Sequence, residues 1–269
     1  MTNSVRDIAP PHAIKAENLG VQFFKSRRRR ASIRDQLFRP GSVKPSEQFW
    51  GLRNVSFTIR PGEAVGVVGA NGQGKSTLLR LVAGVMLPDE GTVEVLDGVA
   101  PLIEVTGGFV GDLTVRENIH LTAGLHGLSK QQVEERFDEI VEFAEIRDFL
   151  DMNYRHLSSG MKVRVGFSVI TQLDEPIILV DEVLGVGDRR FKRKCAKRLE
   201  ELFSGGRTLF LVSHSEANLQ KFCTRGLFLE KGRLVLDGTI DEALEAYARS
   251  TGDFVDDTPV DDDVGESWS

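Results

Sequence analysis

The sequence has 269 residues, 41% of them hydrophobic, which suits one α/β domain with a sizeable core. Its formal net charge is −6, with 40 acidic and 34 basic residues, so we expect no nucleic-acid partner. Cys195 and Cys223 lack metal-ligand spacing and predict core thiols in a reducing compartment. The apolar runs, such as residues 177–180, are far shorter than the roughly 20 residues that span a bilayer. We therefore expect any membrane work to need other chains.

The first quarter of the chain predicts strands separated by a basic insertion. Residues 1–12 are expected to form a leader, and residues 13–23 alternate enough to predict a strand. Residues 25–47 are rich in basic residues, serine and proline, and predict an insertion. Residues 52–59 alternate apolar and polar side chains, as a half-buried strand does. Residues 64–68 then form a continuous apolar run that predicts a buried strand.

The middle of the chain predicts helices with recognisable starts. Residues 75–86 have helical periodicity, and short strands are expected over residues 91–96 and 101–105. Thr114 and Ser129 are each followed three residues later by Glu or Gln, which is the pattern of a capping box. They predict helices over roughly residues 114–126 and 129–146, and a further helix is expected to begin near Ser158.

The last third predicts an alternation of strands and helices. Buried strands are expected over residues 177–181 and 208–212, with a helix over residues 191–203 between them. A hairpin is expected over residues 227–236, and a helix capped by Thr239 ends near Ser250.

The tail, residues 251–269, differs in composition from everything before it. It has no Lys or Arg, and its acidic residues are Asp253, Asp256, Asp257, Asp261, Asp262, Asp263 and Glu266. This composition predicts a disordered segment.

A glycine-rich segment between the buried strand and the helix fits the phosphate-loop pattern G-x-x-x-x-G-K-[ST]. We expect its residues and the next one to bind ATP: Gly69, Ala70, Asn71, Gly72, Gln73, Gly74, Lys75, Ser76 and Thr77. Glycines let such a loop turn its backbone N–H groups toward phosphate oxygens, beside the positive end of the helix. Lys75 is expected to reach the β- and γ-phosphates, and Ser76 to ligate Mg²⁺.

Two carboxylates end the buried strand at residues 177–181. Asp181 and Glu182 follow four apolar residues, and the carboxyl end of this strand is expected to lie beside the phosphate loop. Asp181 is predicted to hold Mg²⁺ through water, and Glu182 to act as general base toward the attacking water.

Together with further motifs, these residues resemble the ABC ATPase family over about residues 13–247. The motif Leu157, Ser158, Ser159, Gly160 and Met161 is similar to the family signature. The segment after Glu182, ending at Asp188, resembles the D-loop. His214, just after a buried strand, resembles the switch histidine that contacts the γ-phosphate, although a lone histidine is more often structural.

The resemblance implies a fold, a partner and a nucleotide. The fold class is α/β: a P-loop NTPase ABC cassette over residues 13–250, with a mixed β-sheet core, a small antiparallel β subdomain and an α-helical signature subdomain over residues 107–165. In the family each ATP lies between the phosphate loop of one cassette and the signature of the other, so the chain is expected to work as a homodimer or beside a second cassette. Phe23 is the candidate to stack on adenine and Trp50 the second choice; a core role is nearly as plausible for either.

Several details resemble the branch of the family that exports lipid-linked polysaccharides such as O-antigen and teichoic acid. They are the LSSGM signature, the DEVLGVGD segment, and Glu104 at the coupling position where most ABC proteins have glutamine. Gly111 and Val115 depart from the branch pattern. The resemblance implies an ATP- and Mg²⁺-dependent ATPase at the cytoplasmic face of the cell membrane, bound to integral membrane permease subunits that handle the glycan. Alternatives are another transporter class, a non-transport ABC ATPase, or a non-hydrolysing regulator, against which the intact catalytic residues argue.

The sequence allows two interpretations of the basic insertion, residues 25–47. It has six arginines and Lys25 against the single acid Asp35 before residue 47. A solvated loop and a contact with anionic lipid headgroups or a pyrophosphate-linked glycan are both compatible with that charge.

Overall fold

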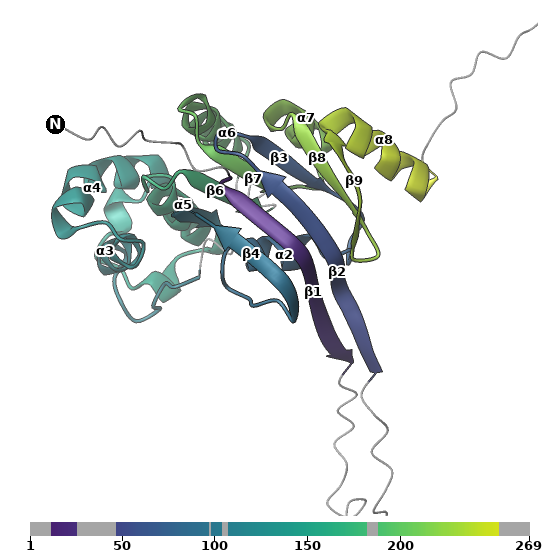
Figure 1. Ribbon diagram of the computed structural model, residues 1–269. Helices are drawn as coiled ribbons and strands as arrows, with labels where there is room; N and C mark the ends of the chain where they lie inside the picture. The colour runs from purple at the N-terminus through teal and green to yellow at the C-terminus, as the bar shows by residue number, and fades with distance from the viewer. Residues whose placement is uncertain (1–11, 26–46, 97, 104–106, 182–187, 253–269) are drawn as a thin grey trace, which may run out of the picture.

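The computed structural model describes residues 12–25, 47–96, 98–103, 107–181 and 188–252. Two β-sheets and the helices around them make up this part of the chain (Figure 1). The smaller sheet is antiparallel, in the order β2-β1-β4. Its strands are β1 (Ile14–Lys25), β2 (Glu47–Ile59) and β4 (Glu90–Val95).

The larger sheet has the order β5-β6-β7-β3-β8-β9. Its strands are β3 (Ala64–Val68), β5 (Val99–Leu102), β6 (Ile177–Asp181), β7 (Thr208–Val212), β8 (Arg225–Glu230) and β9 (Arg233–Thr239). All neighbours pair in parallel except β8 and β9, which form an antiparallel hairpin. The sheet is therefore mixed, and the carboxyl ends of β3, β6 and β7 share one edge.

Alternate residues of the central strands enter two different hydrophobic cores. In β6, Ile178 and Val180 belong to one core, whereas Ile177 and Leu179 belong to the other. Successive side chains of a strand point to opposite faces of the sheet, so a strand buried on both faces contributes alternate residues to two cores.

Helix α2 (Lys75–Val82) lies between the two sheets. Its side chains Leu78, Leu79 and Leu81 are fully buried in the core that also contains residues of β1, β2, β3 and β7. The helix contacts β2 and β4 of the small sheet and β6 and β7 of the large one. Its position, and that of the loop before it, is therefore fixed from two sides.

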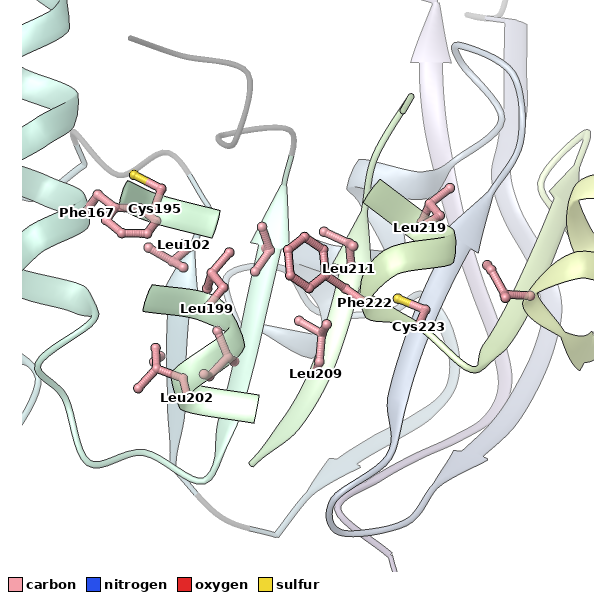
Figure 2. Close-up of a cluster of buried hydrophobic side chains, with 14 of the residues drawn as sticks. Leu102, Phe167, Cys195, Leu199, Leu202, Leu209, Leu211, Leu219, Phe222 and Cys223 are labelled. Carbon is pink, nitrogen blue, oxygen red and sulfur yellow. The ribbon is translucent and has the colours of Figure 1, made fainter. Parts of the chain in front are cut away.

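The opposite face of the large sheet is covered by four helices. They are α5 (Ser159–Ile170), α6 (Arg189–Ser204), α7 (Glu216–Phe222) and α8 (Ile240–Thr251). Figure 2 shows how their side chains meet those of the strands, with Phe167, Cys195 and Phe222 directed into one continuous core. Both cysteines are buried there and are not joined, and burial raises the pKa of each thiol to about 12.

A helical unit lies at one end of the molecule, opposite α8 (Figure 1). It comprises α3 (Val115–Leu125), α4 (Lys130–Ala144), the short 3-10 helices η1 (Arg147–Phe149) and η2 (Tyr154–His156), and the inner face of α5. Thr114 and Ser129 form the two predicted capping boxes, because each hydroxyl accepts from the third residue of its helix and that residue's side chain accepts in return.

Most predicted elements are confirmed within two or three residues, but one helix end and the start of one strand were wrong, and one helix was not predicted: the strand predicted from residue 52 begins at Glu47. The helix expected over residues 75–86 ends at Val82, where Ala83 caps it and Gly84 follows at a φ of +69°. Helix α7 was not predicted at all, because its seven residues are too few for a clear period. The predicted leader up to residue 11, the insertion between residues 26 and 46 and the tail from residue 253 lie outside the described residues. Among the described helices, none combines the length and apolar character needed to cross a bilayer.

Candidate nucleotide site

The predicted phosphate loop joins β3 to α2 at the carboxyl edge of the large sheet. Gly69, Gly72 and Gly74 have φ values of +148°, +77° and +100°, a region that favours glycine. Gly74 is also the N-cap of α2, and no side chain caps this helix end. The loop therefore bends as its glycines predict, and the first N–H groups of α2 are left for a ligand.

Neighbouring backbone leaves no room for larger residues at two of these glycines. A Cβ atom on Gly74 would lie 2.7 Å from the carbonyl oxygen of Gly51 and 2.6 Å from Leu52. A Cβ atom on Gly69 would collide with the carbonyl of Leu229 in β8. The loop is thus held between β2 on one side and β8 on the other.

Lys75 directs its ammonium group back into the loop. The residue is only 5% exposed, and its Nζ donates hydrogen bonds to the carbonyl oxygens of Gly69 at 2.6 Å and Ala70 at 2.9 Å. Because a buried charge must be paired or hydrogen-bonded, these contacts hold the cation at the centre of the loop. It is positioned to meet an anion bound there.

Gln73 supports the loop from outside. Its side-chain carbonyl accepts a hydrogen bond from the backbone N–H of Lys231, in the turn between β8 and β9. Gly232 in the same turn accepts from the N–H of Arg53 at 2.8 Å. The hairpin predicted over residues 227–236 therefore braces the phosphate loop, which the sequence did not indicate.

A cavity of about 390 Å³ opens over the loop. It is lined by Phe23, Phe49, Gly51, Asn71, Gly72, Gly74, Lys75, Ser76, Thr77 and His214. Six of the nine loop residues predicted to bind ATP are in this set; the other three, Gly69, Ala70 and Gln73, do not line the cavity. Carbonyl groups of the first two hold Lys75, and the side chain of Gln73 binds the β8–β9 turn.

Two phenylalanines form the apolar part of the cavity. Phe23 in β1 pairs in register with Phe49 in β2, and their ring centroids are 5.7 Å apart. A Cβ atom on Gly51 would strike the Phe23 ring, so this glycine makes room for it. Trp50, the second choice for adenine, does not line the cavity: it pairs with Gln22, one position along, and carries the Arg53 guanidinium at 5.1 Å from its ring.

Phe49 is the site residue that the sequence analysis missed. Its exposed fraction is 46%, which is high for a large aromatic side chain. The predicted strand began at Leu52, whereas β2 begins at Glu47 and places Phe49 opposite Phe23. The aromatic pair Phe49 and Trp50 just before a strand was the signal that could have found it.

Asp181 and His214 lie on the strands next to the loop. Asp181 ends β6 in register with Val212 of β7, which pairs in turn with Val67 of β3. His214 follows β7 by two residues and lines the cavity. The two side chains therefore lie at the same sheet edge as the phosphate loop. Glu182 and Glu104 lie outside the described residues.

The predicted signature forms the beginning of α5. Ser158 is its N-cap, and the hydroxyl accepts from the N–H of Met161 at 3.3 Å. Leu157 is buried, whereas Ser158 and Ser159 are exposed, and nothing lies within 4 Å of a Cβ on Gly160. None of the five signature residues lines the cavity. The signature is therefore not part of the cavity over the chain's own phosphate loop.

Asp188, the predicted D-loop residue, is the N-cap of α6. Its carboxylate accepts from the N–H groups of Arg190 and Phe191, each at 2.9 Å. The Phe191 hydrogen bond, with the Arg164 guanidinium, holds the pKa of this carboxyl below its ordinary value. Arg164 belongs to α5, so an ion pair joins the signature helix to the start of α6.

Comparison with protein families decides the assignment. Residues 52–185 match the family described as ABC transporter. A curated relative from Klebsiella pneumoniae, "O-antigen export system ATP-binding protein RfbB", is 40% identical over 223 residues, which are 82% of this chain and 91% of that protein. The chain belongs to the ABC transporter family. The prediction of an ABC ATPase is thereby confirmed.

Other relatives and solved structures agree with this assignment. The "Teichoic acids export ATP-binding protein TagH" of Bacillus anthracis is 40% identical over 215 residues, covering 80% of this chain and 38% of that protein. A solved structure titled "Dimeric structure of a post-hydrolysis state of the ATP-binding cassette MJ0796 bound to ADP and Pi" has a TM-score of 0.67 at 23% identity, covering 84% of this chain and 98% of that one. The latter confirms the predicted fold class.

We expect Gly74→Ala to destabilise the protein more than Gly84→Ala does. Both glycines have positive φ, which costs a non-glycine residue roughly 1–2 kcal/mol. Only Gly74 also meets backbone within contact distance, since nothing lies within 4 Å of a Cβ on Gly84. Urea unfolding would compare the two variants, and an equal loss in both would show that the fit between the loop and β2 contributes nothing.

Proposed function

We propose that this chain is the ATP-hydrolysing subunit of an exporter of lipid-linked polysaccharide, of the O-antigen or teichoic acid type. The extent of the match to the O-antigen export relative carries the proposal, because it includes most of both chains. The cassette would sit at the cytoplasmic face of the cell membrane, bound to integral membrane permease subunits. ATP binding and hydrolysis would close and reopen a pair of cassettes and so drive the membrane partner.

In this proposal the loop and its cavity bind the nucleotide in two parts. The N–H groups at the start of α2 and the Lys75 ammonium bind the phosphates, since both are directed into the loop. Phe23 and Phe49 contact the adenine, because they form the apolar wall of the same cavity. The cavity of about 390 Å³ lies within the usual range for small-molecule sites.

The metal would be held by oxygen ligands. The Ser76 hydroxyl lines the cavity and Asp181 lies at the same edge of the sheet. Hydroxyl and carboxylate oxygens with water are the ligands that Mg²⁺ prefers, so the residues present fit this ion. When bound, it would neutralise charge on the β- and γ-phosphates.

The remaining residues act on the γ-phosphate and its attacking water. His214, which lines the cavity just after β7, would contact the γ-phosphate. Glu182 orients the attacking water and accepts its proton, as the residue directly after Asp181. Glu104 couples the γ-phosphate to the permease.

A second copy of the chain would complete each site. The exposed Ser158 and Ser159 and the half-buried Gly160 do not line the chain's own cavity, although α5 has a helix N-terminus suited to an anion. A partner's triphosphate is the anion that the proposal assigns to them. We therefore propose a homodimer with two ATP molecules at the interface.

The aromatic assignment is tested by truncation. We expect Phe23→Ala and Phe49→Ala each to weaken ATP binding by about twofold to tenfold, the contribution of one aromatic contact. Trp50→Ala, one position from Phe49 in the same strand, is the matched control and is expected to leave affinity within about twofold, since Trp50 does not line the cavity. Titration calorimetry with ATP measures all three, and a larger effect at Trp50 would reverse the assignment.

The paired cassette is tested by removing the general base. We expect Glu182→Gln to lower ATP turnover by roughly 10²–10⁴-fold and to accumulate a dimer when MgATP is added. Light scattering after size exclusion measures the dimer. Adding Lys75→Ala should abolish it, because the phosphates lose their buried cation. Normal hydrolysis by the Glu182→Gln protein would exclude this residue as the base.

The export function is tested in cells of the native organism. Deleting the coding sequence should remove the surface polysaccharide and leave its lipid-linked form inside the cell. We expect the wild-type chain and Lys130→Ala to restore export, since Lys130 is exposed at the start of α4, but not Lys75→Ala. Blotting of surface and intracellular glycan gives the readout. An unaltered surface polysaccharide in the deletion strain would contradict the proposed substrate while leaving the ATPase assignment intact.

A further inference from the structure

Helix α6 presents a strongly basic surface. Its first ten residues, Arg189–Arg198, contain no acid and seven basic side chains: Arg189, Arg190, Lys192, Arg193, Lys194, Lys197 and Arg198. Phe191, Cys195 and Leu199 are buried against the sheet, so the charged residues occupy the rest of the helix surface. Neither the phosphate cavity nor the signature uses this surface.

Three of the seven cations are already neutralised by the helical unit. Arg190 and Lys194 pair with Glu145 at 3.5 and 3.7 Å, and Arg198 pairs with Glu139 at 3.6 Å. Lys194 also donates to the carbonyl of Phe143 at 2.9 Å. These contacts fasten α6 to the end of α4.

The other four cations form what we call the basic face: Arg189, Lys192, Arg193 and Lys197. Arg189, Arg193 and Lys197 are four residues apart, and Lys192 lies one turn from Arg189, so they share one side of the helix. All four are exposed. Among the described residues, Arg189, Lys192 and Arg193 have no carboxylate within 4 Å, and Lys197 reaches only Glu201 at 3.9 Å. The basic face thus has four closely spaced charges with little local compensation.

The chain carries a segment of opposite charge after α8. Between Asp253 and Glu266 there are seven acidic residues and no basic ones. They follow α8, which packs on the same face of the large sheet as α6. The 11 residues from Asp253 to Asp263 can span up to roughly 36–40 Å when extended, and their charge is opposite to that of the basic face.

We propose that the acidic segment, residues 253–266, binds the basic face of α6 in the same copy of the chain. The recognition is electrostatic: carboxylates meet three arginine or lysine side chains that lack a partner among the described residues, and a fourth with one distant partner. Exposed ion pairs are individually weak, so the contact depends on several at once and on low ionic strength. Its effect is to shield a cationic surface that would otherwise attract polyanions and anionic membranes.

Zero-length crosslinking with a carbodiimide tests the contact directly. The reagent joins a lysine amine to a carboxylate only when the two touch, and the basic face offers Lys192 and Lys197. Trypsin leaves the whole acidic segment on one peptide that begins at residue 250, because there is no Lys or Arg between Ser250 and Ser269. We expect mass spectrometry to find this peptide joined to Lys192 or Lys197. A mixture of isotopically light and heavy protein should give links within one copy.

Two arginine variants make the test selective. Arg189→Gln with Arg193→Gln retains both reactive lysines and should reduce the link by roughly threefold to tenfold, as expected for two exposed ion pairs. About 0.5 M salt should do the same. The matched control, Arg60→Gln with Arg233→Gln, removes two exposed arginines elsewhere and should leave the link unchanged. ATP turnover and circular dichroism verify that each variant is folded.

A truncation ending at Gly252 tests the shielding. We expect it to bind phosphatidylserine vesicles more strongly than the full chain at low salt, and the added Arg189→Gln and Arg193→Gln changes to cancel the gain. Each of three outcomes would overturn the proposal. The crosslink could be unaffected by the two arginine changes, the crosslinks could form only between light and heavy copies, or the truncated chain could bind vesicles no better than the full chain.

Discussion

The structure around the phosphate loop depends on one interaction, the pairing of the Lys75 ammonium with the carbonyl oxygens of Gly69 and Ala70. A cation that is 95% buried must be compensated within the protein, and these two carbonyls supply that compensation at 2.6 and 2.9 Å. They can do so only because glycine at position 69 lets the chain turn away from β3. The loop is therefore arranged around a positive charge that its own backbone holds.

Three segments distant in sequence hold the loop in this arrangement. Gly51 in β2 packs against Gly74, Leu229 in β8 against Gly69, and Lys231 in the β8–β9 turn binds Gln73. Helix α2, fixed between the two sheets, holds the far end. Donors and charges that are fixed before the ligand arrives do not have to be reorganised when it binds, which is the basis of electrostatic catalysis. The small antiparallel sheet is thus part of the site, both as a wall for the loop and as the source of the two phenylalanines.

Local rules predicted the parts of the protein in which local forces decide the structure. The phosphate loop, the capped helices α3, α4 and α8 and the buried strands all follow from spacing, capping and period. The misses have tertiary causes. Lys231 contacts the phosphate loop because β8 pairs with β3, and Phe49 lies opposite Phe23 because of the register between β1 and β2. Neither strand pairing can be predicted from the local sequence. Asp188 was predicted from a motif; its two N-cap hydrogen bonds are local to α6, whereas its ion pair with Arg164 depends on the position of α5 relative to α6.

That last contact bears on how the two halves of a split site relate to each other. Arg164 lies in the second turn of the helix that begins with the signature, and it binds both Asp188 and Glu145. Asp188 in turn is six residues beyond Glu182. In the proposed dimer the signature binds the partner's nucleotide, whereas the proposed base acts on the chain's own nucleotide. The ion pair between Arg164 and Asp188 therefore links the helix that carries the signature to the segment that follows the proposed base. The Arg164 side chain is 20% exposed and the Asp188 side chain 54% exposed, so solvent reaches this pair from the carboxylate side. A shift of α5 against a second copy must either carry Asp188 with it or break the ion pair to the carboxylate that caps α6, so the signature and Asp188 are expected to move together for as long as that pair holds.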